Sequence, residues 1–595
     1  MRVDGYAPIA DYAAIGDGRT VALVAADGAI DWLCLPDLDS GSVFAALLDA
    51  DRGGSFSLCP DVAFDVERRY EPGTNVLETT FTTAEGAVRV TDAMLLPAVG
   101  LAPFRELVRQ VETVAGRVPM RWRVEPRFDY GRREATIEMR SGVPVATAGP
   151  LALAVRSWGA GQPSTEQGEI AGRFELGEGE RAVIVLAVAH QEPLVIPSRR
   201  EVEARLEATR SFWTGWVADR GYDGPWRDEV LRSALALKLL FYAPSGAIAA
   251  AATTSLPELL GGERNWDYRF SWVRDASFTL AALFNLGCPH EADAFFWWVL
   301  HASQLTHPEL RVLYGLDGGV DAPEETLALS GYRGSRPVRI GNGALDQRQL
   351  DVYGDFVHAV WLYQRAGGNV DADTAKRVAE IADLVCSIWR EPDSGIWEVR
   401  SSPVHFTQSK MMCWVALDRA ADLAATGTIP DAHAARWRQE ALAVGEFVEA
   451  DCWSERQQSY VRFAGSEELD ASLLLGELMG YGGGTRSRMA LTIEAVRREL
   501  GRGPLLYRYS GEDGLSGGEG SFVCCSFWLV EALARSGRVD EATELMEQMV
   551  GLANNVGLYS EEIEPESGEF LGNMPQGLVH LALISAAGAI AKAAA

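Results

Sequence analysis

The sequence predicts a chain of two domains, an antiparallel β-sandwich followed by an all-helical barrel of the (α/α)6 type, with a linker helix between them. The hydrophobic pattern has a period of two up to about residue 195 and a helical period after it. The helical part contains twelve helical patterns, and the connections between them alternate between short and long. Because 595 residues exceed one ordinary hydrophobic core, separate domains are expected. We assign residues 1–198 to the sandwich, 199–225 to the linker and 226–595 to the barrel.

The β-sandwich is predicted from short alternating runs that flank turn-forming dipeptides. The clearest turn signals are Asp27-Gly28 and Glu85-Gly86. Period-two alternation on both sides of such turns is typical of antiparallel hairpins. The runs interpreted as strands are Val21–Val24, Ile30–Leu33, Val76–Thr83, Val88–Thr91, Glu106–Val114, Pro119–Val124, Leu151–Arg156 and Ala182–Ala189.

One amphipathic helix is predicted between the domains, over residues 201–220. Its apolar side chains recur at helical spacing, which favours a helix that packs one face against its neighbours. These side chains are Val202, Leu206, Phe212, Trp213, Trp216 and Val217.

The barrel is predicted from the number and connection lengths of its helices. The helical patterns cover about residues 228–243, 274–287, 290–304, 351–367, 372–391, 406–424, 431–450, 469–480, 487–500, 520–535, 538–552 and 575–592. Connections after odd-numbered helices are long and rich in Gly, Trp and charge, and long connections are commonly functional. Because the chain direction reverses at every helix, all of the long connections should emerge at one end of the barrel. They are residues 244–273, 305–350, 392–405, 451–468, 501–519 and 553–574.

The amino-acid composition limits the classes of partner that the protein is expected to bind. The net charge is −29, which argues against nucleic acid or anionic lipid as the main partner and suits a neutral ligand. The start has no apolar run of signal-peptide length, and we interpret Leu578–Ala594 as a buried helix rather than a membrane anchor. The eight cysteines form no Cys-x-x-Cys pair and the eight histidines no His-Glu-x-x-His motif. We therefore expect a soluble cytoplasmic protein without disulfides, metal or cofactor.

Glu398 is the first candidate for chemistry. It ends the run Gly395-Ile396-Trp397-Glu398 in the long connection 392–405. A neighbouring indole disfavours the ionised carboxylate and raises its pKa, as a general acid at neutral pH requires. The alternative is a loop glutamate that pairs with Arg400.

Glu561 is the second candidate, in the acidic segment 557–568. A Ca²⁺ site, a solvated surface and a base that activates water are all compatible with the local sequence. The helix count brings Glu398 and Glu561 to the same end of the barrel. Two carboxylates that face each other across a pocket are what hydrolysis of a glycosidic bond requires.

Residues 263–275 mix aromatic and ion-pairing side chains at the opening of a predicted helix. Indole rings pack on the apolar faces of sugars, and Asp and Arg bind adjacent hydroxyls through charge-assisted hydrogen bonds. This segment therefore favours a sugar-binding site, with a structural salt-bridge cluster as the alternative.

Residues 264–276, Arg-Asn-Trp-Asp-Tyr-Arg-Phe-Ser-Trp-Val-Arg-Asp-Ala, resemble the signature of glycoside hydrolase family 15. That family contains glucoamylases and bacterial and archaeal trehalases. Gly395–Glu398 with Phe406–Lys410 is similar to the family's general-acid region. Leu558–Glu562 with Gly568–Asn573 is similar to its general-base region.

The N-terminal part extends this resemblance to essentially the whole chain. Asp11–Gly18 and Gly28–Trp32 resemble the β-domain that precedes the barrel in the trehalase-like branch of the family. The resemblance implies an (α/α)6 barrel, in agreement with the helix count.

The resemblance also implies roles for individual residues. Glu398 would be the general acid, Glu561 the general base, and Arg274 with Asp275 would bind hydroxyls of the non-reducing glucose. The fungal glucoamylase pattern Ser-Glu-Gln is Ser-Glu-Glu here, so Glu562 is an alternative base. The further substrate contacts that we expect from the same regions are Trp266, Trp397 and Lys410.

We expect inverting, exo-acting hydrolysis of a small α-glucoside with release of β-glucose, and favour α,α-trehalose as the substrate. Glucoamylase-like or isomaltose-type hydrolysis of malto- or isomalto-oligosaccharides is the alternative. The loop sequences do not indicate whether the enzyme prefers an α-1,1, an α-1,4 or an α-1,6 linkage. A glycoside phosphorylase is disfavoured because the acidic residues 561–566 would repel phosphate. A non-catalytic sugar-binding protein would not need both Glu398 and Glu561. The sequence leaves open whether the chain forms a homo-oligomer.

Overall fold

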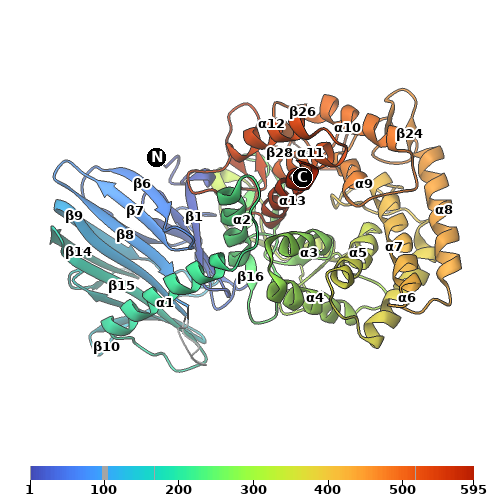
Figure 1. Cartoon of the computed structure of the whole chain (residues 1–595). Helices are drawn as coiled ribbons and strands as arrows, with labels where there is room; N and C mark the ends of the chain where they lie inside the picture. Colours follow the sequence, from blue (N-terminus) through green and yellow to red (C-terminus); the bar gives the residue numbers. More distant parts are fainter. Residues whose placement is uncertain (1, 97–104, 167, 516, 595) are drawn as a thin grey trace.

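The computed structural model describes residues 2–96, 105–166, 168–515 and 517–594. An N-terminal β-domain lies beside a C-terminal ring of helices (Figure 1), and one continuous hydrophobic core extends through both. The predicted order of β-domain, linker helix and helical barrel is confirmed.

The β-domain consists of two antiparallel sheets that share the strand β9 (Arg105–Val124). The sheets face each other where β1 packs against β8. The first sheet adds β1 (Tyr12–Gly16), β2 (Val21–Ala25), β3 (Ala29–Cys34), β4 (Ser42–Phe44), β5 (Phe56–Pro60), β13 (Ser164–Glu166) and β14 (Glu169–Gly177). The second adds β6 (Asp65–Tyr70), β7 (Leu77–Thr82), β8 (Gly86–Met94), β10 (Thr136–Arg140), β11 (Val143–Ala148), β12 (Leu151–Trp158) and β15 (Arg181–His190).

The prediction of two separate strands over 106–114 and 119–124 is wrong, because both runs belong to β9. The first half of β9 pairs with β8 and β15, and the second half pairs with β5 and β14. Gly116, in the gap between the two runs, does not turn the chain back but pairs with Gly86 of β8. Pro119 does not break the strand, since its carbonyl oxygen still accepts from Asp61 N at 2.8 Å.

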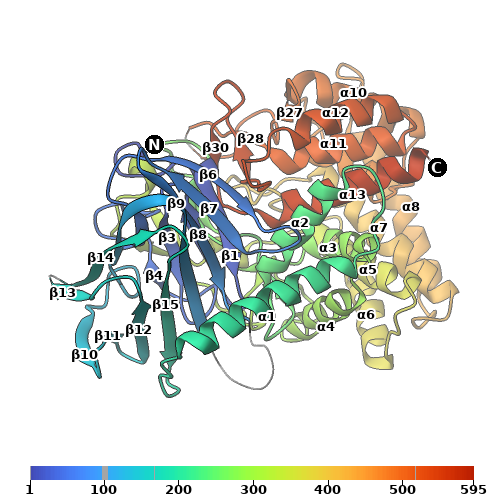
Figure 2. The same ribbon diagram turned by 60° about the vertical axis from the view of Figure 1, so that its left-hand side comes forward.

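The linker helix α1 (Arg199–Ala218) runs along the β-domain towards the barrel (Figure 2). Ser198 and Glu201 form a capping box at its N-terminus, which satisfies two free backbone N–H groups. Leu206 and Trp213 are buried, as the sequence pattern predicts. Trp216 reaches the barrel, where its Nε1 donates to Glu291 Oε1 at 2.6 Å.

All twelve predicted barrel helices are present in the described residues. Six of them form an inner ring, in which each helix packs against the next and α13 returns to α3. The inner helices are α3 (Asp275–Leu286), α5 (Asp351–Arg365), α7 (Thr407–Ala425), α9 (Leu475–Leu478), α11 (Val523–Arg535) and α13 (Gly577–Ala594). The outer helices are α2 (Arg227–Leu240), α4 (Pro289–Gln304), α6 (Ala372–Ile388), α8 (Ala434–Asp451), α10 (Arg486–Leu500) and α12 (Val539–Val550).

Two inner helices differ from the others. The eighth predicted helix is short, a 3-10 turn over Ala471–Leu474 followed by α9. In the described chain only α13 is long and apolar enough to cross a membrane by length and composition, and 72% of it is buried in the protein. The barrel therefore accounts for its apolar sequence, as predicted.

Short elements connect the helices. Those nearest the cavity described below are β18 (Thr254–Pro257), β19 (Asn265–Asp267), β20 (Ser271–Trp272), β28 (Ser521–Phe522), β29 (Glu562–Ile563) and β30 (Phe570–Leu571). The others are β16 (Phe241–Tyr242), β17 (Ala247–Ile248), β21 (Leu313–Tyr314), β22 (Glu325–Leu327), β23 (Val338–Ile340), β24 (Trp453–Ser454), β25 (Ser459–Tyr460), β26 (Gly501–Arg502) and β27 (Leu505–Leu506), with 3-10 turns at Ile9–Asp11, Tyr332–Gly334 and Gly343–Asp346.

A buried ion pair ties the β-domain to the barrel segment 264–275. Arg269 binds Asp267 through two hydrogen bonds of 2.9 and 2.7 Å and donates to Ser40 O at 2.8 Å. Trp32 of β3 donates to Ala252 O at 2.8 Å. These contacts fix the segment that leads into α3, so the β-domain supports the loop end of the barrel.

We expect Arg269→Ala to lower the free energy of unfolding by about 3–5 kcal/mol, because the Asp267 carboxylate would stay buried without a counter-ion. Urea-induced unfolding followed by tryptophan fluorescence measures the change. Arg117→Ala is the control, because Arg117 is 73% exposed in its pair with Glu175 and should contribute less than about 1 kcal/mol. Equal losses in the two variants would contradict the role of Arg269.

Candidate active site

A cavity lies at the end of the barrel where the long connections meet. Side chains from residues 258–274, 396–400 and 508–522 line it. These residues come from three of the six predicted long connections and from the starts of α3 and α11. The three connections thus lie together at one end of the barrel, as the alternation of connection lengths predicts.

Glu398 reaches this cavity from the connection between α6 and α7. Its φ of 57° lies in the left-handed region, a strained conformation for a residue other than glycine. Trp272 Nε1 donates to Glu398 Oε1 at 2.6 Å, and Arg274 Nη1 lies 3.5 Å from the same oxygen. Burial raises the pKa of Glu398, while Arg274 and Trp272 oppose the shift. The direction matches the prediction, but the indole that binds Glu398 is that of Trp272, and its hydrogen bond lowers the pKa instead of raising it.

Arg274 and Asp275 lie beside Glu398 at the opening of α3. Arg274 donates through Nη1 to Ile396 O at 2.7 Å and through Nε to Asp275 Oδ1 at 3.2 Å. Burial raises the pKa of Asp275, against the effect of the guanidinium. Although burial disfavours the charged guanidinium, Asp275 and Glu398 raise the pKa of Arg274. The structure thus brings together three of the predicted site residues.

Glu561 is fully buried immediately before β29. Asn573 N donates to its Oε2 at 3.2 Å. Gly572 has a φ of 70°, and a Cβ there would lie 2.5 Å from the same oxygen, so the close approach requires glycine. Burial and the negative charge of Glu258 raise the pKa of Glu561 to about 8, and Arg508 acts in the opposite direction.

Tyr268 and Trp272 connect the two carboxylates. Their rings pack edge to face, with centroids 5.3 Å apart. Trp272 binds Glu398, and the Tyr268 hydroxyl faces Glu561, where it favours the ionised form. Burial raises the pKa of Tyr268, and the charges of Glu561 and Glu398 both add to the shift. Glu398 and Glu561 are therefore neighbours of one aromatic pair, which our choice of site residues missed although both rings lie in the motif 264–276.

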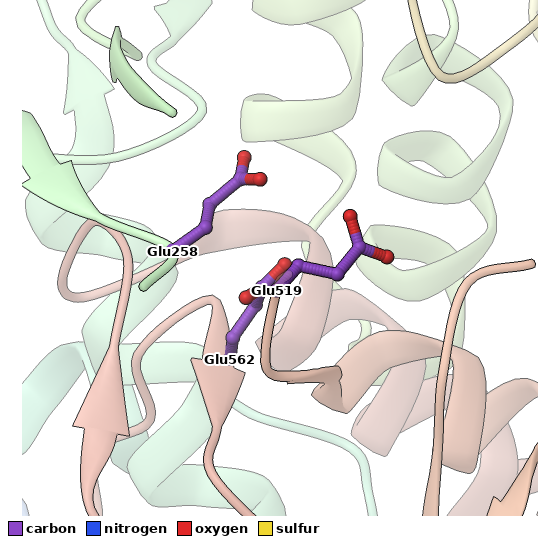
Figure 3. Close-up of side chains that lie close together, drawn as sticks. All are labelled: Glu258, Glu519 and Glu562. Atoms are coloured by element: carbon purple, nitrogen blue, oxygen red, sulfur yellow. The ribbon is translucent and has the colours of Figure 1, made fainter. Parts of the chain in front are cut away.

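Glu562 belongs to a different group of charges. Gly520 N donates to its Oε2 at 2.8 Å, and Arg508 Nη2 lies 3.5 Å from its Oε1. The same Nη2 binds Glu258 at 2.6 Å and also pairs with Glu519. Figure 3 shows the three glutamates side by side. Glu561, not Glu562, is thus the carboxylate that contacts the aromatic pair.

The three glutamates around Arg508 offer ligand atoms within 4.8 Å of one another, a spacing that could hold a metal ion. The Arg508 guanidinium already lies among them and supplies the counter-charge. The acidic segment 557–568 does not converge on one point either. Glu564 accepts from Glu566 N at 2.9 Å within its own turn, and Glu566 is exposed. These residues are accounted for by an ion-pair network and a turn.

The remaining predicted contacts differ in position. Trp266 and Trp397 line the cavity, and Trp397 Nε1 donates to Asp470 Oδ1 at 2.9 Å. Lys410 is fully buried, and its Nζ donates to Trp389 O and Glu391 O, both at 2.6 Å. Its expected contact with substrate finds no support, because the amino group is bound by main-chain oxygens outside the cavity lining.

The arrangement suits acid–base chemistry on a polar, uncharged molecule. One carboxylate is held by an indole and a guanidinium, the other by a tyrosine and a backbone amide, and the pKa of each is raised. Glu258 and Glu519 both pair with Arg508, the cation that favours the ionised form of Glu561, while the charge of Glu258 opposes that form. The segment of Glu258 carries no local signal of this pairing, because Glu258 and Arg508 lie 250 residues apart in the chain.

Comparisons with known proteins agree with this geometry. The family model described as glycosyl hydrolases family 15 matches residues 224–588, and the model described as trehalase-like, N-terminal, matches residues 3–194. A trehalase of Mycolicibacterium smegmatis is 39% identical over 98% of this chain and 91% of its own length. A trehalase of Thermoplasma volcanium is 36% identical over 99% and 94%, respectively.

Solved structures support the fold. A bacterial glucoamylase crystallised with acarbose aligns over 100% of this chain and 95% of its own, with a TM-score of 0.76 at 14% identity. At that identity the likeness shows a common architecture of β-domain and (α/α)6 barrel. Taken with the match to the family model over most of the barrel, it follows that the chain belongs to glycosyl hydrolases family 15 and is a glycoside hydrolase with a trehalase-like N-terminal domain.

Proposed function

We propose that the protein is an inverting, exo-acting α-glucoside hydrolase that cleaves α,α-trehalose into two glucose molecules. The observation that carries the proposal is the shared contact of Glu398 and Glu561 with the Tyr268–Trp272 pair. The relatives named as trehalases, which match nearly the whole chain, support trehalose as the substrate.

In the proposed mechanism, protonated Glu398 gives its proton to the glycosidic oxygen. Glu561 acts in its ionised form, which Arg508 and the Tyr268 hydroxyl favour against burial, and accepts a proton from a water molecule that attacks the anomeric carbon from the opposite face. Because the pKa of Glu561 is about 8, its ionised fraction grows as the pH rises towards that value. An inverting pair of carboxyl groups is expected to lie roughly 6.5–9.5 Å apart, which leaves room for that water. Arg274 and Asp275 would bind hydroxyls of the non-reducing glucose and hold its anomeric carbon between the two carboxylates. Neither step requires a cofactor.

The surroundings of the site suit a neutral sugar. The cavity lining mixes acidic and basic side chains, namely Glu258, Glu398 and Asp513 with Arg264, Arg274, Arg400 and Arg508. The relatives named as trehalases disfavour a glycoside phosphorylase. The net charge of −29 and the burial of α13 in the barrel support a soluble, cytoplasmic enzyme without nucleic-acid or membrane partners.

The substrate is tested with trehalose, maltose, isomaltose and soluble starch in phosphate buffer, with assays for both glucose and glucose 1-phosphate. We expect trehalose to give the highest kcat/KM and free glucose as the sole product. A preference for maltose or isomaltose would replace trehalose by the glucoamylase-like or isomaltose-type alternative. Glucose 1-phosphate as a product would reject hydrolysis.

We expect Glu398→Gln to lower kcat on trehalose by several powers of ten, because the leaving glucose needs a proton. An aryl α-glucoside with a good leaving group should lose far less, since its departure needs little proton transfer. Steady-state kinetics on both substrates measure this difference. Equal losses on the two substrates would remove Glu398 from the role of acid.

Single substitutions of Glu561 and Glu562 show which of the two glutamates is the catalytic base and which belongs to the ion-pair network. Glu561→Gln should abolish turnover while glucose binding, measured by calorimetry, persists. Glu562→Gln is the matched control and should keep measurable activity, because its carboxylate binds Arg508 and Gly520 N. Activity retained in the first variant and lost in the second would transfer the role of base to Glu562.

A further inference from the structure

A rim cluster is made of Trp266 and Arg400, which line the cavity, and of Glu324 and Arg339, which contact them. The guanidinium carbons of Arg339 and Arg400 lie over the Trp266 ring, 4.5 and 5.0 Å from its centroid. Glu324 lies 3.3 Å from Arg339 Nε through Oε1 and 3.3 Å from Arg400 Nη2 through Oε2. One carboxylate thus holds two arginines against one indole.

The rim cluster joins three connections of the barrel. Trp266 comes from 244–273, Glu324 and Arg339 from 305–350, and Arg400 from 392–405. Trp266 O also accepts from Asn573 Nδ2 at 3.0 Å, and the backbone N of Asn573 binds Glu561. The cluster therefore has a defined geometry relative to both proposed catalytic carboxylates.

Side-chain exposure increases from Arg274 to Glu398 to Arg400. Arg274 is 14% exposed, Glu398 20% and Arg400 34%. Arg400 also follows Glu398 by two residues and lines the same cavity. If the non-reducing glucose binds at Arg274 and the acid protonates the glycosidic oxygen, the leaving sugar lies on the outer side of Glu398, next to Arg400.

The chemistry of the rim cluster favours hydrogen bonds over stacking. The two guanidinium groups cover a face of Trp266, so this face is closed to a sugar ring. A planar guanidinium presents a rigid fork of N–H donors that can bind two adjacent oxygen atoms at once. Adjacent hydroxyls are what a pyranose leaving group displays.

We propose that Arg400, held by Glu324 and Trp266, is the residue that recognises the leaving sugar. This proposal rests on the proposed function and adds the acceptor half of the site to it. Trp266 then acts as a positioning residue and not as a stacking platform. Arg400 binds the substrate only when the leaving group is a sugar.

The experiment compares trehalose with α-D-glucopyranosyl fluoride, which has the same non-reducing glucose but loses fluoride. We expect Arg400→Ala to lower kcat/KM for trehalose by about tenfold to a hundredfold, the size expected for a hydrogen bond to a charged group. The value for glucosyl fluoride should stay within about twofold of the unmodified protein. Arg400→Lys keeps the charge without the fork and should give an intermediate loss on trehalose alone.

Two further variants separate recognition from folding. Glu324→Gln weakens the ion pairs to both arginines and should raise KM for trehalose without changing glucosyl fluoride hydrolysis. Arg311→Ala is the matched control. Arg311 lies in the same connection as Glu324, is 43% exposed and does not line the cavity. It should leave both substrates unchanged.

Each kinetic outcome either supports or overturns the role of Arg400 in recognising the leaving sugar. Unchanged trehalose kinetics in Arg400→Ala, or equal losses on both substrates, would overturn it, since Arg400 would then be irrelevant or would act through the acid. If the unmodified protein cleaves maltose but not trehalose, the proposed substrate fails, and the comparison of maltose with glucosyl fluoride decides the role of Arg400. A protein inert towards all three substrates would overturn both proposals.

Discussion

The contact between Tyr268 and Trp272 is the interaction on which the arrangement of the site depends. Trp272 Nε1 donates to Glu398 and the Tyr268 hydroxyl interacts with Glu561, so one aromatic pair contacts both carboxylates. The segment that carries both rings is fixed from behind by the Arg269–Asp267 pair and its hydrogen bond to the β-domain. The described residues of the N-terminal domain thereby contribute to the site from outside the cavity lining.

Electrostatics at the site are a balance between burial and paired charge. Burial alone would keep Glu398 and Glu561 neutral, and Arg274 and Arg508 are the cations that oppose it. Arg508 is shared with the neighbouring glutamates, so its effect on Glu561 is diluted, and the pKa of Glu561 rises to about 8. Such opposed terms are typical of acid and base residues that must hold different protonation states in one pocket.

Sequence patterns predicted the periodic features, such as the helices, and the features that are encoded within one continuous stretch of the chain. The helical period gave twelve helices, and their parity placed residues 398 and 561 at one end. Contacts between distant segments carry no such pattern. The position of Lys410 in a motif predicts a substrate contact, but the fold turns its amino group to main-chain oxygens. The pairing of Glu258 with Arg508 became visible only when segments 250 residues apart were brought together.

The central claim is that a water molecule, activated by Glu561, attacks the sugar from the face opposite Glu398. The anomeric form of the first glucose released from an α-glucoside tests it most directly, by proton NMR within the first minutes before mutarotation mixes the anomers. From trehalose, the account predicts equal amounts of β-glucose, from the unit that water attacks, and α-glucose, from the leaving unit. Initial release of α-glucose alone would mean retention through a covalent intermediate, and would contradict two carboxylates separated by a water molecule.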